Sequence, residues 1–250
     1  TLLGNGKTIT VTGNCAAIGK IGEHGVVSNV IVAGNVSTGS FAYIGALANT
    51  NNGKVENVLS TALVTSTAGL VADLSTEELG GAGGIVGLND VKGTIDNVTY
   101  QGNSGDSTTG VVKANIGGGG IVGTNKGVIT NATNKGCLGA YNSTESGKSL
   151  SKYSYSGGIA GFNYGEISQS TTNGAGKILF QRAASDSGAV EFNNVGAGGI
   201  VGYNKAGAKV TTSYFEGIRI HADQAVGGIV GINAGEVSYC YNFFPFICSW

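Results

Sequence analysis

A short apolar cluster recurs along the chain, and each copy is followed by the same polar and glycine positions. Copies begin at Gly45, Gly83, Gly119, Gly157, Gly198 and Gly227, with GGIVGTNKGVITN from Gly119 as a clear example. The first large apolar residue of each copy is Leu47, Ile85, Ile121, Ile159, Ile200 or Ile229. Four residues later every copy has an asparagine, at Asn51, Asn89, Asn125, Asn163, Asn204 and Asn233. Repetition of this kind is typical of stacked repeats.

Each copy predicts three short strands separated by glycine or asparagine corners. In the copy that starts at Gly119 these strands are GGIVG, VITNA after Gly127, and a segment after Gly136. Runs of β-branched residues between glycines and asparagines indicate strands, and no copy holds the ten or more residues of helical period that a helix needs. The sequence therefore predicts an all-β fold.

A repeat of this size cannot bury its apolar face alone, so neighbouring repeats must stack at the roughly 4.8 Å spacing of paired strands. Parallel crossover connections are almost always right-handed, which sets the hand of the stack. We therefore predict a right-handed parallel β-helix, a β-solenoid of about seven coils. Its aligned isoleucines, Ile85, Ile121, Ile159 and Ile200, should form one inward column.

The six aligned asparagines have a physical role in such a stack. Asparagine tolerates the left-handed backbone of a tight corner. When coils stack, each side-chain amide can hydrogen-bond the amide of the next coil, as in the ladders of stacked strands. The sequence predicts a structural ladder through all six positions.

The repeated glycines could also be compared with a nucleotide-binding loop. Such a loop occurs once per site, precedes a helix and ends in Lys-Ser/Thr. Here the motif recurs, is followed by β-branched residues, and no copy carries Gly-Lys-Ser/Thr. We interpret the glycines as corners, and we expect no cofactor.

Composition narrows the classes of partner. Only 12% of the residues are charged and the net charge is −1, which leaves no electrostatic footprint for nucleic acid or anionic lipid. No apolar run approaches the roughly 18 residues of a membrane helix, so we expect no membrane insertion. The chain begins at Thr1 and contains no methionine, which predicts a processed product or an excerpt of a longer protein.

The repeated pattern GGIVGxNxGxIxN resembles the GLUG motif, over roughly residues 2–244. This glycine-rich repeat occurs in large bacterial surface and secreted proteins, including adhesin-like proteins and the N-terminal parts of some IgA-cleaving metallopeptidases. The resemblance implies a secreted or cell-surface scaffold, and the motif itself specifies no chemistry. The opening LLGNGKTITVTG is similar to the segment that commonly precedes such arrays.

We predict one β-solenoid domain over residues 1–250, with an N-terminal coil at 1–24, repeats at 25–240 and an apolar segment at 241–250. The last segment is dense in aromatic side chains, at Phe243, Phe244, Phe246 and Trp250. An open end of a β-solenoid exposes unpaired strand edges that must be capped or paired. The segment is therefore either a cap or a junction between copies of the chain.

The stretch after the repeated motif varies in length, which predicts loops gathered at one corner of the stack. They fall approximately at 65–80, 103–116, 139–156 and 183–196, with a stub near 222–226. Loops grouped on one face of a solenoid are the usual place for binding. Tyr141, Tyr153 and Tyr155 are our candidates for contact with a glycan or a protein, and the alternative is that they only cover the edge of a coil.

The chain has four cysteines, at Cys15, Cys137, Cys240 and Cys248. Their spacing is not typical of a zinc site, so we expect no bound metal. Cys240 and Cys248 are close enough in sequence to form a disulfide, and the alternative is buried free thiols. For Cys15 and Cys137 we expect buried free thiols.

Catalytic signatures are weak. The metallopeptidases that carry this repeat need HExxH, whereas His24 and His221 lie far apart. Pectin-degrading β-helices place two or three aspartates and a basic residue in one groove. Here GIRIHAD offers Arg219 and His221, and the aspartates are scattered over different repeats. Glycoside hydrolysis needs a pair of carboxylates at defined separation.

The sequence therefore predicts a non-catalytic extracellular β-solenoid, the stalk or adhesive segment of a surface protein. Its partners would be a glycan or protein of a host or neighbouring cell, bound through the loop face. The first alternative is a protomer of an extracellular filament assembled end to end from copies of itself. The second alternative is an enzyme that acts on polysaccharides.

Overall fold

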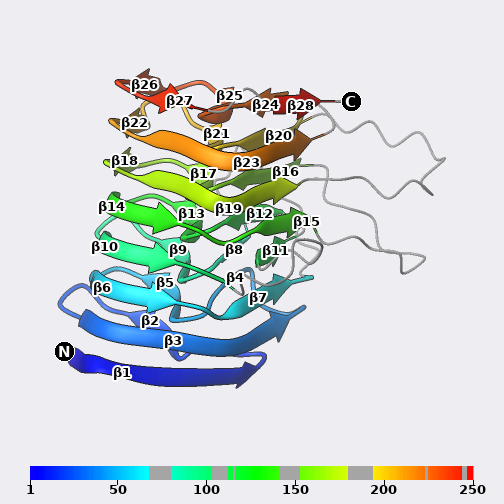
Figure 1. Ribbon diagram of the computed structural model, residues 1–250. Helices are drawn as coiled ribbons and strands as arrows, with labels where there is room; N and C mark the ends of the chain where they lie inside the picture. The colour runs from blue at the N-terminus through cyan, green and yellow to red at the C-terminus, as the bar shows by residue number, and fades with distance from the viewer. Residues whose placement is uncertain are drawn as a thin grey trace.

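The computed structural model describes residues 1–67, 80–102, 112–114, 116–140, 153–179, 194–222, 225–243 and 247–249. Within these ranges the regular elements are β-strands, and no helix occurs. The strands form three parallel sheets of 15, 6 and 7 strands (Figure 1). The prediction of an all-β fold with long parallel sheets is confirmed, and the arrangement is compatible with a β-solenoid.

The bounds of the strands follow the repeats. The 15-stranded sheet contains β1 (Leu2–Gly13), β3 (Val26–Thr38), β6 (Lys54–Ser60), β7 (Leu63–Ser66), β10 (Thr94–Tyr100), β11 (Val112–Ala114), β14 (Val128–Asn134), β15 (Leu138–Ala140), β18 (Glu166–Ser168), β19 (Thr171–Leu179), β22 (Lys209–Thr211), β23 (Tyr214–Ala222), β26 (Glu236–Ser238), β27 (Tyr241–Asn242) and β28 (Ile247–Ser249). The 6-stranded sheet contains β4 (Tyr43–Gly45), β8 (Gly81–Gly83), β12 (Gly117–Gly119), β16 (Tyr153–Gly157), β20 (Asn194–Gly198) and β24 (Ala225–Gly227). The 7-stranded sheet contains β2 (Ile18–Ile21), β5 (Ala48–Asn51), β9 (Val86–Asn89), β13 (Val122–Asn125), β17 (Ala160–Asn163), β21 (Val201–Asn204) and β25 (Val230–Asn233).

Each repeat visits the sheets in the same order. From β12 in the 6-stranded sheet the chain enters β13 in the 7-stranded sheet, then β14 and β15 in the 15-stranded sheet, and β16 returns to the first. Strands at equivalent positions pair from repeat to repeat, as β13 does with β9 and β17. Figure 1 shows the resulting layers, from β1 at one end to β26 at the other. Side chains at one repeat position therefore form columns along the stack.

The segment GGIVG is not one strand, as the sequence suggested, but a corner between two. In the third copy β12 ends at Gly119 and β13 begins at Val122, so that Gly120 and Ile121 form the turn. The second and third predicted strands of this copy correspond to β14 and β15, which belong to the same sheet. The glycine pair is thus needed for a turn and not for a straight strand.

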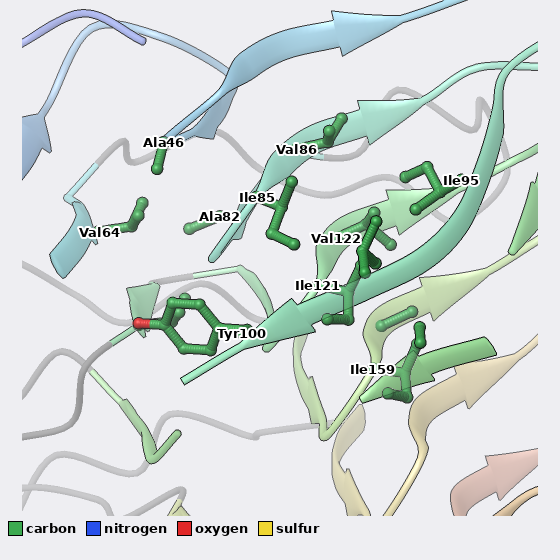
Figure 2. Packing of buried hydrophobic residues seen from close by; sticks show 14 of the residues in the cluster. Ala46, Val64, Ala82, Ile85, Val86, Ile95, Tyr100, Ile121, Val122 and Ile159 are labelled. Carbon is green, nitrogen blue, oxygen red and sulfur yellow. The ribbon is translucent and has the colours of Figure 1, made fainter. Parts of the chain in front are cut away.

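The aligned isoleucines form the centre of the core. Leu47, Ile85, Ile121, Ile159 and Ile200 are fully buried in one apolar cluster. The backbone N–H of Ile121 donates to the carbonyl of Ile159 at 3.1 Å, and Ile159 donates to Ile200 at 2.9 Å. Figure 2 shows Ile85, Ile121 and Ile159 within this cluster. The predicted inward column is confirmed.

A second inward column explains the second glycine of the pair, which five copies carry and Ala46 replaces in the first copy. The column runs through Tyr100, Asn134, Thr172, Phe215 and Asn242, which pair in register. A Cβ added at Gly84 would collide with the Tyr100 ring, and one at Gly199 would come within 2.6 Å of Phe215 Cγ. The bare glycine backbone therefore leaves the space that these side chains fill.

Candidate functional site

The six corner asparagines form a continuous hydrogen-bonded ladder. Each side-chain amide nitrogen donates to the side-chain oxygen of the next asparagine at 2.8 Å, from Asn51 through Asn89, Asn125, Asn163 and Asn204 to Asn233. The first five of these side chains are fully buried. This is the arrangement expected from the aligned corners, and it satisfies polar groups that would otherwise destabilise the interior.

The left-handed backbone that the sequence suggested for the ladder asparagines is absent from them and occurs at a different repeat position, which sequence reasoning missed. Seven residues at one repeat position have φ between 48° and 56°: Asn29, Asn57, Asn97, Asn131, Gln169, Thr212 and Tyr239. They lie within or beside strands of the 15-stranded sheet, where they bend each repeat. Asparagine adopts this conformation readily, whereas a β-branched residue such as Thr212 rarely does. The last asparagine of GGIVGxNxGxIxN was the signal that could have revealed this corner.

An outward groove lies beside this bend. It has a volume of about 430 Å³ and is lined by Asn97, Asn131, Thr133, Gln169, Thr171, Thr212, Tyr214 and Tyr241. Its floor is a column of residues that pair in register, in which Thr133 is followed by Thr171, Tyr214 and Tyr241. All eight lining side chains are uncharged. The volume lies in the range of roughly 300–1,000 Å³ that is typical of small-ligand pockets, but the lining is more polar than in most of them.

Aromatic rings close one end of the groove. The rings of Tyr214 and Tyr241 stack with 5.1 Å between centroids and an interplanar angle of 1°. Phe243 packs its ring edge-on against Tyr241, at 4.7 Å. Tyr241 and Phe243 are 47% and 58% exposed. The three rings therefore form an aromatic surface that is open to solvent.

Of the tyrosines that the sequence predicted as ligand contacts, Tyr155 has a described side chain, and it does not form this surface. Tyr155 is fully buried, with its ring 5.1 Å from that of Phe162 and 5.3 Å from that of Tyr203. This burial does not fit the predicted ligand contact, and the register neighbours Gly117 and Gly196 have no side chains that would compete with the ring for space. Tyr153 lies in β16, where only its backbone is described. Tyr141 lies outside the described residues.

The predicted loops are only partly tested. Three of them, 65–80, 139–156 and 183–196, include the connection from a strand of the 15-stranded sheet to one of the 6-stranded sheet. The range 103–116 differs, because it contains β11 and part of its length precedes that strand. Most residues of these ranges lie outside the described part of the chain.

The described part of the C-terminal segment adds a strand to the 15-stranded sheet. β28 pairs in parallel with β23, where Ile247 lies opposite Ile220. Phe243 packs on Tyr214 and Tyr241 at the outer face, not over Ile229 and Val237 as a cap would. Phe244, Phe246 and Trp250 lie outside the described residues.

The cysteines differ from expectation at one position. Cys15 is exposed rather than buried, because it lies between β1 and β2 at the edge of the stack. Cys137 is half-buried, not fully buried as expected, and forms no disulfide. Cys240 is also free, so it does not form the disulfide with Cys248. Its thiol donates to the carbonyl of Ser238 at 3.3 Å, and burial raises its pKa.

Stacking brings two carboxylates together that are far apart in sequence. Glu56 and Asp96 lie opposite each other on β6 and β10. Glu56 forms an ion pair with Lys54 at 2.6 Å. Asp96 accepts hydrogen bonds from Thr130 Oγ1 at 2.6 Å and Asn131 Nδ2 at 2.9 Å, and these bonds lower its pKa. A general acid needs a raised pKa, so the shift at Asp96 has the opposite direction.

The other predicted candidates, Arg219 and His221, lie in β23, where only their backbone is described. Arg219 lies in β23 opposite Lys177, and Asp223 lies outside the described residues. Where the structure describes the chain, no three His, Cys, Asp or Glu side chains gather as metal ligands would. The same residues include no helix of the length and apolarity that crossing a membrane requires.

No protein-family model, curated protein or solved structure matches the chain. The resemblance to GLUG-motif proteins thus stays a prediction. The fold and the groove are the observations from which a function must be argued.

Proposed function

We propose that the chain is a non-catalytic extracellular β-solenoid that serves as the stalk or adhesive segment of a surface protein. In this proposal the solenoid is right-handed and has about seven coils, because parallel crossovers favour that hand. The observation that carries it is the groove of uncharged polar and aromatic side chains on the outer face of a repeated scaffold.

The interior supports a mechanical role. Five fully buried asparagines take part in the ladder, in which Asn125 both donates to Asn163 and accepts from Asn89. Backbone hydrogen bonds between repeats run alongside this ladder. A stack in which every repeat is bonded to its neighbours resists bending and local opening, which suits a segment that holds a binding surface away from a cell.

The outer face supports adhesion rather than turnover. The lining of the groove contains no titratable carboxylate or imidazole that could transfer a proton at neutral pH. Glu56 and Asp96, which lie on the strands nearby, are held by Lys54 and by Thr130 and Asn131. A surface that binds without transferring protons fits an adhesive segment whose partner is a glycan or protein of another cell.

The experiment uses beads coated with the purified chain. Coated beads should adhere to cultured epithelial or bacterial cells, whereas beads coated with heat-unfolded chain should not. In parallel, the chain should release no reducing ends or unsaturated products from pectin, alginate or chitin. Turnover that is lost in Asp96→Asn or Arg219→Ala would overturn the proposal, and so would beads that adhere equally well after unfolding.

End-to-end assembly is a second candidate. It is favoured by a column of apolar side chains that is buried along the stack and exposed at its last member. Val237 is 36% exposed, whereas its partner Val210 and the equivalent Ile167, Ile129 and Ile95 are at most 1% exposed. Another copy of the chain stacked on β26 would bury this apolar surface, as each repeat does for the one before it. Electron microscopy of the chain at micromolar concentration tests this: end-to-end fibres support it, and single particles of one length contradict it.

A further inference from the structure

The groove beside the left-handed corner has free hydrogen-bonding groups. Within the described part of the chain, the side chains of Thr133, Gln169 and Thr212 make no hydrogen bond to protein. Asn97 Nδ2 donates to Asn57 Oδ1 at 2.6 Å, and Asn131 Nδ2 donates to Asp96. These bonds orient the two amides and leave their oxygens to accept. The groove therefore offers both donors and acceptors to a ligand with many hydroxyl groups.

Its polar groups are regularly spaced. Asn97, Asn131, Gln169 and Thr212 occupy one position in consecutive repeats, so successive side chains are separated by roughly 4.8 Å. One pyranose ring in an extended glycan has a similar length. A chain of sugar rings that lies along the stack would thus meet an equivalent polar side chain at each ring.

Tyr214 supplies an aromatic face at the end of this row. One face of its ring is covered by Tyr241, which lies in the following repeat. On the other side its register partner is Thr171, whose side chain is too short to cover a ring. Tyr214 is one of the residues that line the groove. Aromatic rings pack well against the C–H face of a sugar, and the Tyr hydroxyl adds a polar contact.

The type of residue at the left-handed backbone position changes at the same place. The left-handed position holds asparagine in four consecutive repeats, from Asn29 to Asn131, and then Gln169 and Thr212. These last two residues line the groove, next to Tyr214. Threonine is strained in this conformation, and strained backbone is commonly retained at binding sites. The departure from asparagine thus coincides with the aromatic end of the groove.

We infer that this groove is a binding site for an uncharged oligosaccharide, with Tyr214 as the stacking platform and Gln169 and Thr212 as hydrogen-bonding partners. The inference rests on the proposed adhesive function and names the ligand class and the surface. The lining has no charged side chain, so the carboxylates of an acidic glycan would find no cationic partner in it. None of the lining residues falls in the loop ranges predicted from the sequence.

Binding is tested with a panel of hexasaccharides by isothermal titration calorimetry on the whole chain. The neutral probes are cellohexaose, mannohexaose, maltohexaose and N-acetylated chitohexaose, and the acidic probe is hexagalacturonate. At least one neutral probe should bind at millimolar or lower concentration, and hexagalacturonate should not. Tyr214→Ala and Gln169→Ala should each weaken the affinity by about tenfold, as for a central contact. Tyr214→Phe should stay within about threefold of the unchanged chain, because it keeps the ring.

The control is Phe41→Ala, which removes a similarly exposed ring far from the groove and should leave affinity unchanged. Circular dichroism and the thermal midpoint of each variant identify any that fails to fold, and Gln169→Ala changes a groove side chain without removing a ring. No binding to any neutral probe overturns the inference, as does binding that survives both Tyr214→Ala and Gln169→Ala. The bead assay separates the two proposals: if Tyr214→Ala beads adhere as well as the unchanged chain, adhesion stands and the groove is excluded as its site.

Discussion

Replacing Asn125 with alanine tests the asparagine ladder where it is most enclosed. The Asn125 amide nitrogen donates to Asn163 Oδ1 at 2.8 Å and to the Gly127 carbonyl at 3.2 Å. Its side-chain oxygen accepts from Asn89 Nδ2 at 2.8 Å. The substitution therefore removes two ladder bonds at once, one on each side.

The magnitude follows from what the neighbours retain. Without Asn125, the Asn89 amide keeps a bond to the Gly93 carbonyl at 3.2 Å, and Asn163 Oδ1 keeps a donor in the Gly165 N–H at 3.3 Å. Both groups are buried but only partly unsatisfied, so the loss in unfolding free energy should be about 1–3 kcal/mol. Asn125→Asp should cost more, because a buried carboxylate would face the Asn163 oxygen with no hydrogen to donate.

Urea unfolding followed by circular dichroism measures the change. Asn233→Ala is the matched control, because Asn233 is exposed and makes a single ladder bond, to Asn204. Its loss should be under about 1 kcal/mol. The reasoning is refuted if Asn125→Ala and Asn233→Ala both change the stability by less than about 0.5 kcal/mol, since the ladder would then contribute no more than a solvated corner.

Three further outcomes are expected. Gly84→Ala should lower the thermal midpoint strongly, because its methyl group would collide with the Tyr100 ring. Gly19→Ala has open space around it and should change the midpoint little. Equal effects of the two substitutions would contradict the packing. In pulsed labelling with iodoacetamide read by mass spectrometry, exposed Cys15 should react before Cys240, whose pKa burial raises, and equal rates would argue against that burial. The pKa of Asp96 is lowered in the folded chain, so its contribution to stability is present above its unfolded pKa and is lost as the pH falls through the folded value. Asp96→Asn should accordingly be less stable than the unchanged chain at neutral pH, and the difference should vanish in acid; a constant difference would mean that the charge is not involved.

The isoleucine column and the asparagine ladder could be predicted because their residues recur at the same position in every repeat. Ile121 and Asn125 lie four residues apart in a motif that recurs with almost no change, so aligning the copies is equivalent to stacking them. The glycine pair was recognised as important but was assigned to a strand. Its role depends on Tyr100 and Phe215, which come from a different strand across the core.

The groove could not be found in the same way, because it depends on contacts between repeats at positions where the residue types differ. Thr133, Thr171 and Tyr214 have little in common in sequence, and only the register of β14, β19 and β23 places them in one column. Tyr155 misled the prediction for the opposite reason. It lies in a polar stretch typical of a loop, but the glycines beside it in the sheet, Gly117 and Gly196, create the space that buries it.

The asparagine ladder has a direction, and this has a consequence for the length of such proteins. Every amide donates toward the C-terminal neighbour and accepts from the N-terminal one, as Asn89 does between Asn51 and Asn125. Each repeat therefore presents an acceptor on one side and a donor on the other, whatever its outer residues are. A whole repeat can be duplicated or deleted, and the donor and acceptor of the new neighbours still match. Genes that encode such repeats can thus change the reach of the protein by recombination without redesigning its interior.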